Sequence, residues 1–110
     1  MKKYIIYGAG KYLEDYLPDI KDFYKNILMI VDGSDDKIGK NLNGFEIKSK
    51  EELKNVSDDV TIAIASKKFY NSIINDIKKI NPNLQCIPLY EALLSVYPVT
   101  GYCNICETNV

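Results

Sequence analysis

Short apolar runs alternate along the chain with segments whose apolar residues recur at helical spacing. The apolar runs at 2–7, 27–31, 45–47, 60–65 and 84–88 predict strands. Helical spacing predicts helices with apolar faces at Tyr12, Leu13, Tyr16, Leu17 and Ile20, and at Phe69, Ile73, Ile74, Ile77 and Ile80, and a last short helix over 90–96. Strands that alternate with helices, with no hairpin signal between successive strands, predict a parallel sheet.

Turn and capping residues mark where these elements begin and end. Pro18 predicts a helix end or kink near Leu17, and the polar segment 34–44 predicts an exposed loop. Ser49, with Glu52 three residues later, forms a capping box for a short helix that reaches about residue 56. Ser66 is the expected cap of the helix after the fourth strand.

The predicted architecture is therefore a single α/β domain of the Rossmann-like kind. We expect a parallel sheet of about five strands with helices on both faces. The domain is expected to span residues 1–97. The polar segment 98–110 is expected to be a tail or the start of a missing C-terminal domain.

Composition narrows the function classes. Apolar residues make up 46% of the 110 residues, enough for a buried core, and the net charge is −1. The lysines form no basic stripe, so no nucleic-acid partner is expected. No run approaches the roughly 20 apolar residues that span a bilayer, and three cysteines do not suggest a disulfide framework. These features predict a cytoplasmic protein, and the absence of His excludes histidine-based acid–base chemistry.

The main chemical signal is Gly8-Ala9-Gly10, between the first strand and the first helix. Glycines at this junction permit a tight turn and let a phosphate approach backbone N–H groups. Leu13 stands where the dinucleotide-binding motif has its third glycine, which serves packing. We expect the turn, with the adjoining Lys11 and Tyr12, to bind a nucleotide. A plain strand-to-helix turn is the alternative.

Two further segments follow predicted strands. Asp32 ends the second strand about 20 residues after the glycine turn, where dinucleotide folds place an acid on the ribose hydroxyls. With Gly33 it is equally well a turn-initiating residue. Ser66 and Lys67 follow the fourth strand and are expected to contact a phosphate, or else to form a helix cap with a solvated lysine.

Cys103 and Cys106 have the spacing of half a zinc knuckle. A structural zinc site needs four ligands, and this chain adds only Cys86, in a predicted strand. No metal site is therefore predicted.

The order of these features resembles the N-terminal Rossmann-like domain of bacterial glycan-modifying enzymes. That group includes nucleotide-sugar acetyltransferases and dehydrogenase-like modules of polysaccharide biosynthesis. The matching segments are 5–10, 30–39, 42–47 and 49–53. The resemblance implies a domain that binds a UDP-sugar or has an NAD-binding fold, with catalysis in a following domain. Segment 101–107 resembles the Cys-x-x-Cys opening before some SAM-dependent methyltransferase domains, which implies a larger transferase.

The leading functional hypothesis is a non-catalytic module that recognises a nucleotide or nucleotide-sugar for an attached transferase domain. NAD and UDP-sugars are the expected ligands, and the Asp32 carboxylate would disfavour NADP. No catalytic residue is assigned, and the expected protein partner is a second copy or a C-terminal domain. The alternatives are a small NAD-dependent oxidoreductase and an interaction module that has lost its ligand.

Overall fold

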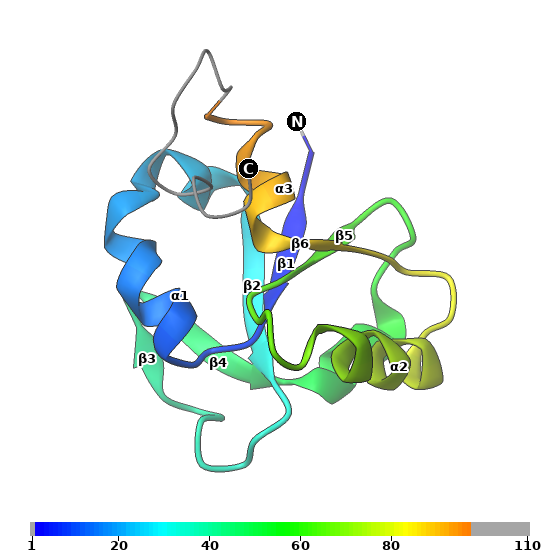
Figure 1. Ribbon diagram of the computed structural model, residues 1–110. Helices are drawn as coiled ribbons and strands as arrows, with labels where there is room; N and C mark the ends of the chain where they lie inside the picture. The colour runs from blue at the N-terminus through cyan, green and yellow to red at the C-terminus, as the bar shows by residue number, and fades with distance from the viewer. Residues whose placement is uncertain (1, 98–110) are drawn as a thin grey trace.

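The computed structural model describes residues 2–97, which form one α/β domain around a six-stranded sheet (Figure 1). The strands are β1 (Tyr4–Tyr7), β2 (Ile27–Asp32), β3 (Asn41–Leu42), β4 (Phe45–Ser49), β5 (Thr61–Ile64) and β6 (Gln85–Pro88). The α-helices are α1 (Lys11–Tyr16), α2 (Tyr70–Ile80) and α3 (Leu89–Leu93). The 3₁₀ helices are η1 (Leu17–Asp19), η2 (Lys21–Asn26) and η3 (Lys50–Asn55). The mixed α/β class predicted from the sequence is confirmed.

The sheet order is β3-β4-β2-β1-β5-β6, and every neighbouring pair is parallel except β3 and β4. Strand β1 is central because Tyr7 lies level with Val31 of β2 on one side and Ile64 of β5 on the other. The chain moves outward from β1 through β2 to β4 and then returns to lay β5 on the other side of β1. The loops that follow β1 and β5 therefore leave neighbouring strands at one edge and continue on opposite sides of the sheet.

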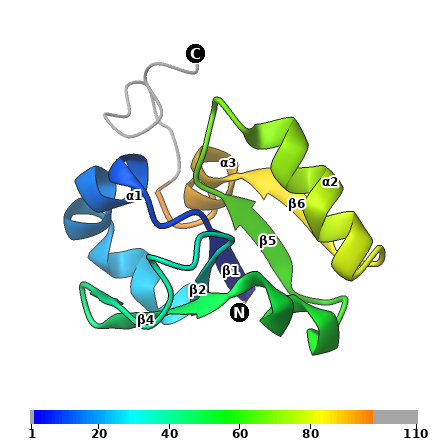
Figure 2. The same ribbon diagram turned by 90° about the horizontal axis from the view of Figure 1, so that it is seen from below.

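Helices cover both faces of the sheet, as predicted. Figure 2 shows α1 and α3 on one face and α2 on the other. Alternate side chains of β1 pack into two separate cores. Tyr4 and Ile6 belong to the cluster that contains Leu13 and Leu93. Ile5 and Tyr7 belong to a second cluster. That second cluster also contains Leu53, Ile62, Ile77 and Leu84. Alternation is what a strand buried on both faces requires.

The strand count and the absence of hairpins were predicted wrongly. Segment 34–44 is not wholly a loop, because Asn41 and Leu42 pair antiparallel with Glu46 and Phe45. The connecting residues Asn43 and Gly44 have φ of 51° and 94°. Asn-Gly with two positive φ angles is the preferred two-residue hairpin connection. The hairpin signal was present in the sequence and adds a sixth, edge strand.

The helix predictions hold in part. Pro18 ends the α-helical hydrogen bonding at Tyr16, and the chain continues as η1. Ser49 is the N-cap of η3, as predicted. Its hydroxyl accepts from the Glu51 N–H, whereas a capping box would have it accept from the Glu52 N–H. Phe69 was predicted to be a core residue and is 57% exposed. The apolar face of α2 is instead carried by Ile77, which is fully buried.

Among residues 2–97 no helix is long and apolar enough to span a membrane, and no group of three or more Cys, Asp or Glu side chains is placed to hold a metal ion. Cys103, Cys106 and the predicted tail lie outside the described residues.

Candidate functional site at the carboxyl edge of the sheet

A cleft of about 740 Å³ opens where β1, β2 and β5 end. In open α/β sheets this edge, at the point where strand order reverses, is the common position for ligands. Its lining residues come from the ends of β1 and β2, from the loops after β1, β2 and β5, and from α1, η3 and α2. They are Tyr7, Gly8, Gly10, Lys11, Tyr12, Asp32, Gly33, Ser34, Lys50, Ala65, Ser66, Lys67, Lys68, Phe69, Ser72, Ile73 and Asp76.

Gly8 is required by the protein's own packing. Its φ is +113°, and a Cβ at this position would lie 3.0 Å from the carbonyl oxygen of Ala65. The turn is also tied to both neighbouring strands, because the Gly8 N–H donates to Val31 O at 2.9 Å and the Ala65 N–H donates to Tyr7 O at 2.8 Å. The first glycine thus brings the loops after β1 and β5 into contact.

Gly10 is different, because nothing in the protein requires it to lack a side chain. Its φ of −92° is open to any residue, and no atom lies within 4 Å of a Cβ built there. Gly10 lines the cleft and immediately precedes α1. A side chain at this position would project into open space beside the first amides of the helix, which have no partner inside the helix.

Asp32 fastens the glycine turn to the end of β2. Its Oδ2 accepts from the Ala9 N–H at 2.7 Å, and its Oδ1 accepts from the Ser34 N–H at 2.8 Å. The bond from the Ser34 N–H is the side-chain turn expected of a turn-initiating aspartate, which was the alternative role considered for Asp32. Two of the three amides of the glycine turn, those of Gly8 and Ala9, are therefore bonded within the protein. Of these three, the Gly10 amide is the one for which the described residues show no hydrogen bond.

Four lysines surround the cleft. Lys11 pairs with Asp15 at 2.7 Å, which raises the pKa of Lys11, and Lys50 lies 3.7 Å from Asp76. Lys67 and Lys68 stand side by side in the loop after β5. Asp32 and Asp76 also line the cleft and Asp15 pairs with Lys11, so the four lysines exceed these three carboxylates by one. The lining is suited to an anionic ligand.

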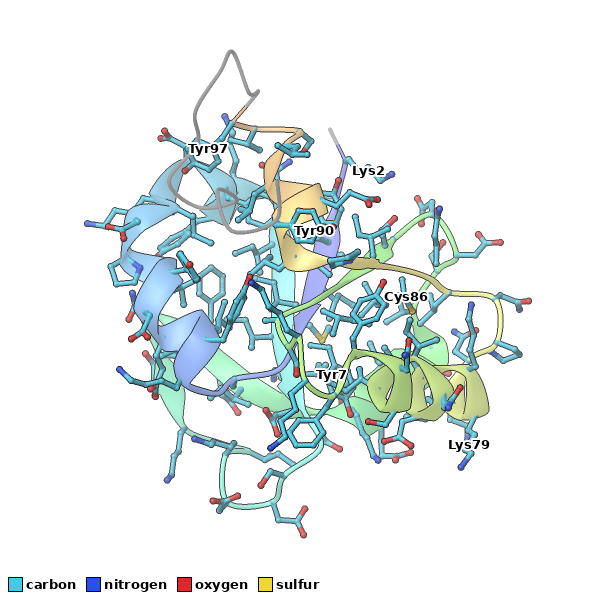
Figure 3. The ribbon with its side chains drawn as sticks, viewed as in Figure 1. Lys2, Tyr7, Lys79, Cys86, Tyr90 and Tyr97 are labelled. Carbon is cyan, nitrogen blue, oxygen red and sulfur yellow. The ribbon has the colours of Figure 1, made fainter. Side chains whose placement is uncertain are left out.

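Tyr7 contributes a polar group at the base of the cleft. The residue is 4% exposed, and its hydroxyl would lie 3.0 Å from a Cβ on Gly33. Burial, followed by the negative charges of Asp76, Asp32 and Glu51, raises the pKa of Tyr7 to about 12. Figure 3 shows Tyr7 near the first turn of α2. The hydroxyl is thus neutral at physiological pH and can donate a hydrogen bond.

A smaller cavity of about 320 Å³ adjoins the cleft and shares Tyr12, Ser66 and Lys67 with it. Its walls are completed by Ile64, Tyr70, Asn71, Pro88, Leu89 and Tyr90. Burial raises the pKa of both Tyr12 and Tyr70. Tyr90 lies on α3 (Figure 3). The two cavities together extend along the carboxyl edge from β2 to β6.

The structure brings the predicted site residues together. Gly8, Gly10, Lys11, Tyr12, Asp32, Gly33, Ser66 and Lys67 all line the cleft, and Ala9 is buried behind it at 1% exposure. Their role in binding remains a prediction. The prediction that Ser66 caps the following helix was wrong, because α2 begins at Tyr70 with Phe69 as its N-cap. The Ser66 hydroxyl instead accepts from the Phe69 N–H at 3.1 Å, within the turn that leads into the helix.

Sequence reasoning missed several lining residues. Tyr7 was counted as core, and Lys50, Ser72 and Asp76 sit on helices whose register relative to the cleft depends on tertiary packing. The Lys67-Lys68-Phe69 run, an aromatic directly after paired cations, was the signal that could have found Phe69.

The fold and the cleft define a class: an α/β domain whose mainly parallel sheet carries a polar, cation-rich cleft at its carboxyl edge. The family model described as C2185-like, N-terminal, matches residues 1–87, and the chain belongs to that family. This finding overturns the expected resemblance to glycan-modifying enzymes, which nothing in the comparisons supports. The glycine turn and the loop after β2 were too general to separate the two families.

Curated proteins gave no match. Among solved structures, the chain is similar to the crystal structure of RSP, a Rex-family repressor, with a TM-score of 0.54 and 16% identity. The similarity covers 88% of this chain and 57% of that chain, so the domain spans little more than half of the repressor's length. At this identity the likeness concerns the fold.

Proposed function

We propose that this domain is a non-catalytic nucleotide-recognition module with a Rossmann-like fold. The observation that carries the proposal is Gly10, a glycine with open space at its Cβ position in the wall of a cleft lined by four lysines. The parallel strands β4-β2-β1-β5-β6, numbered in chain order, run 3-2-1-4-5, the order of the first five strands of the classic doubly wound nucleotide-binding sheet. The likeness to a Rex-family repressor supports the same fold assignment.

The phosphates would lie over the amides of Gly10, Lys11 and Tyr12. The absence of a side chain at Gly10 lets the backbone approach a pyrophosphate closely. Lys67 and Lys68, from the loop on the other side of β1, would supply positive charge. This arrangement shifts the predicted phosphate position from the whole glycine turn to its last residue, because the Gly8 and Ala9 amides are already bonded.

The ribose would lie against Asp32. An ionised carboxylate offers about four acceptor positions, and the two backbone donors occupy one on each oxygen. A ribose hydroxyl can therefore donate to Asp32 without breaking the turn. A 2′-phosphate would meet the carboxylate's negative charge, so we expect NAD to bind more tightly than NADP.

The described residues favour recognition over catalysis. Tyr7, the buried ionisable hydroxyl of the cleft, has a pKa of about 12, far from the value near neutrality that suits a general acid or base. Hydride transfer would also need a substrate site beyond the cofactor cleft. The oxidoreductase alternative is therefore weaker. The ligand-free interaction module is retained as an outcome of the test.

Thermal unfolding with a panel of nucleotides tests the proposal. NAD, NADP, a UDP-sugar and S-adenosylmethionine are each added at millimolar concentration, because a ligand that binds only the folded state raises Tm. We expect NAD to raise Tm, and we expect the shift to vanish in Gly10→Val with the unliganded Tm retained. Gly10→Ala, which adds a single methyl, should give an intermediate shift. If no nucleotide raises Tm, the proposal is wrong and the interaction module replaces it. Oxidation of NADH with turnover would instead support the oxidoreductase.

A further inference from the structure

Phe69 is a large apolar side chain in an unusual place. It lies at the entrance to α2 in the wall of the cleft and is 57% exposed, although its spacing with Ile73 and Ile77 matches the core face of the helix. Exposed aromatic rings that border a polar cleft are suited to stacking on planar groups.

The backbone of Phe69 is held firmly. Its N–H donates to the Ser66 hydroxyl at 3.1 Å, and its carbonyl accepts from the Ile73 N–H at 2.9 Å and from the Ser72 hydroxyl at 3.0 Å. The exposed ring is therefore carried by a fixed main chain. Such an arrangement reduces the entropy lost when a ligand stacks on the ring.

Lys68 defines the environment of the ring. Its Nζ lies 5.4 Å from the ring centroid, within the range of a cation–π contact. The cation covers one face of the ring, and the ring also lines the cleft that contains Asp32, Gly33 and Ser72. A base attached to a ribose at Asp32 would lie in the same cleft as the ring.

We propose that Phe69 is the stacking platform for the base of the bound nucleotide, with Lys68 placed to pair with a phosphate or to support the ring. This inference rests on the proposed function and adds the residue that recognises the base of the nucleotide. Stacking is tolerant of base identity, because every base has a π face. Asp32 and the cations then provide orientation, and Phe69 provides affinity for the base.

A matched pair of probes isolates the base. AMP and ribose 5-phosphate differ only in the adenine, and UMP and NAD extend the comparison to another base and to a dinucleotide. We expect Phe69→Ala to raise the Kd of AMP, UMP and NAD by about 5- to 150-fold, the range found when a stacked aromatic is removed. The Kd of ribose 5-phosphate should not change. Leu28→Ala is the control, because Leu28 is 48% exposed and lies near the amino end of β2.

Failure of the inference and failure of the proposed function give different results. If the wild-type protein binds AMP, UMP or NAD and Phe69→Ala binds them equally well, the stacking role is wrong while nucleotide recognition stands. If the wild-type protein binds none of them, both are wrong. An equal loss of ribose 5-phosphate and AMP binding in Phe69→Ala would also overturn the inference, since the defect would not concern the base.

A fluorescence variant gives a direct readout. The chain contains no tryptophan, so Phe69→Trp introduces a single reporter at the proposed platform. We expect AMP to quench its emission and ribose 5-phosphate to leave it unchanged, with no response in Leu28→Trp. Unchanged emission of Phe69→Trp at an AMP concentration that raises its Tm would overturn the proposal.

Discussion

The two glycines of the turn after β1 should respond differently to the same substitution. Gly8 has φ of +113° and lies against Ala65, whereas Gly10 has φ of −92° and an open Cβ position. Gly8→Ala and Gly10→Ala therefore add the same methyl group two residues apart, with different physical consequences.

The magnitudes follow from the backbone. An alanine held in a sparsely populated φ/ψ region costs about 1–3 kcal/mol, and the Cβ at residue 8 would press on a backbone carbonyl 3.0 Å away. We expect Gly8→Ala to lower the free energy of unfolding by about that amount. At residue 10 the geometry is compatible with alanine, and the reduced freedom of the unfolded chain favours the variant by about 0.4–1 kcal/mol. Because Gly10 is the N-cap of α1, where alanine is less favourable than glycine by a similar amount, we expect little net change in stability.

Urea unfolding followed by far-ultraviolet circular dichroism measures both changes in free energy at one temperature. Thermal unfolding gives a second measurement, in which a change of 1 kcal/mol shifts Tm by about 4–8 °C for a domain of this size. Without ligand, Gly8→Ala should melt below the wild type and Gly10→Ala close to it. A Gly10→Ala variant destabilised as much as Gly8→Ala would refute the reasoning, because Gly10 would then be a structural glycine and would no longer support a ligand site.

Three other predictions concern neighbouring side chains. Asp32→Asn should lower the free energy of unfolding by about 1–3 kcal/mol. The single amide oxygen cannot replace both carboxylate oxygens that accept from Ala9 and Ser34, and the amide NH₂ would face one of these two N–H donors. Urea unfolding measures the change, and an unchanged stability would contradict the prediction. Tyr7 has a folded-state pKa raised from 10.0 to about 12, so its contribution to stability is complete below pH 10 and is lost as pH rises towards 12. Tyr7→Phe should remove that part of the pH dependence, which is checked by comparing unfolding free energies of the two proteins from pH 9 to 12. Tyr90→Ala should raise the Kd of NAD and leave the Kd of AMP unchanged, since Tyr90 lines only the smaller cavity. Titrations of the two ligands measure this. An equal change in both Kd values would exclude a ligand that spans both cavities.

Much of the fold could be predicted from local pattern. Runs such as 60–65 are apolar on both faces, so burial between two helix layers followed from the residues themselves, and Ile62 and Ala63 do face separate cores. The edge hairpin was missed because the polar character of 34–44 outweighed Asn43-Gly44, a two-residue signal. A two-residue strand has little apolar patterning of its own and depends on its partner.

The site residues at the ends of strands could be predicted from the sequence, whereas those whose position depends on tertiary packing could not. Gly8, Gly10 and Asp32 follow strands, and parallel strands bring their carboxyl ends to one edge, so these residues could be grouped from the sequence. Phe69 was harder to place, because its exposure depends on α2 beginning at Tyr70, three residues later than a Ser66 cap predicts, and turning its apolar face towards Ile77. Neither pattern nor glycine spacing distinguished the family, which required the comparison over residues 1–87.

The central position of β1 has a consequence for how the cleft comes into existence during folding. One wall of the cleft is the loop after β1, and the other is the loop after β5. The two loops come together only after β5 has paired with β1. Such distant pairings are made late, because the entropy of closing the long intervening loop must be overcome first. A ligand that touches both walls would therefore bind only the completed sheet. Its binding energy would be added to the cooperative stability of the whole domain, and no fragment that ends before β5 would respond to it.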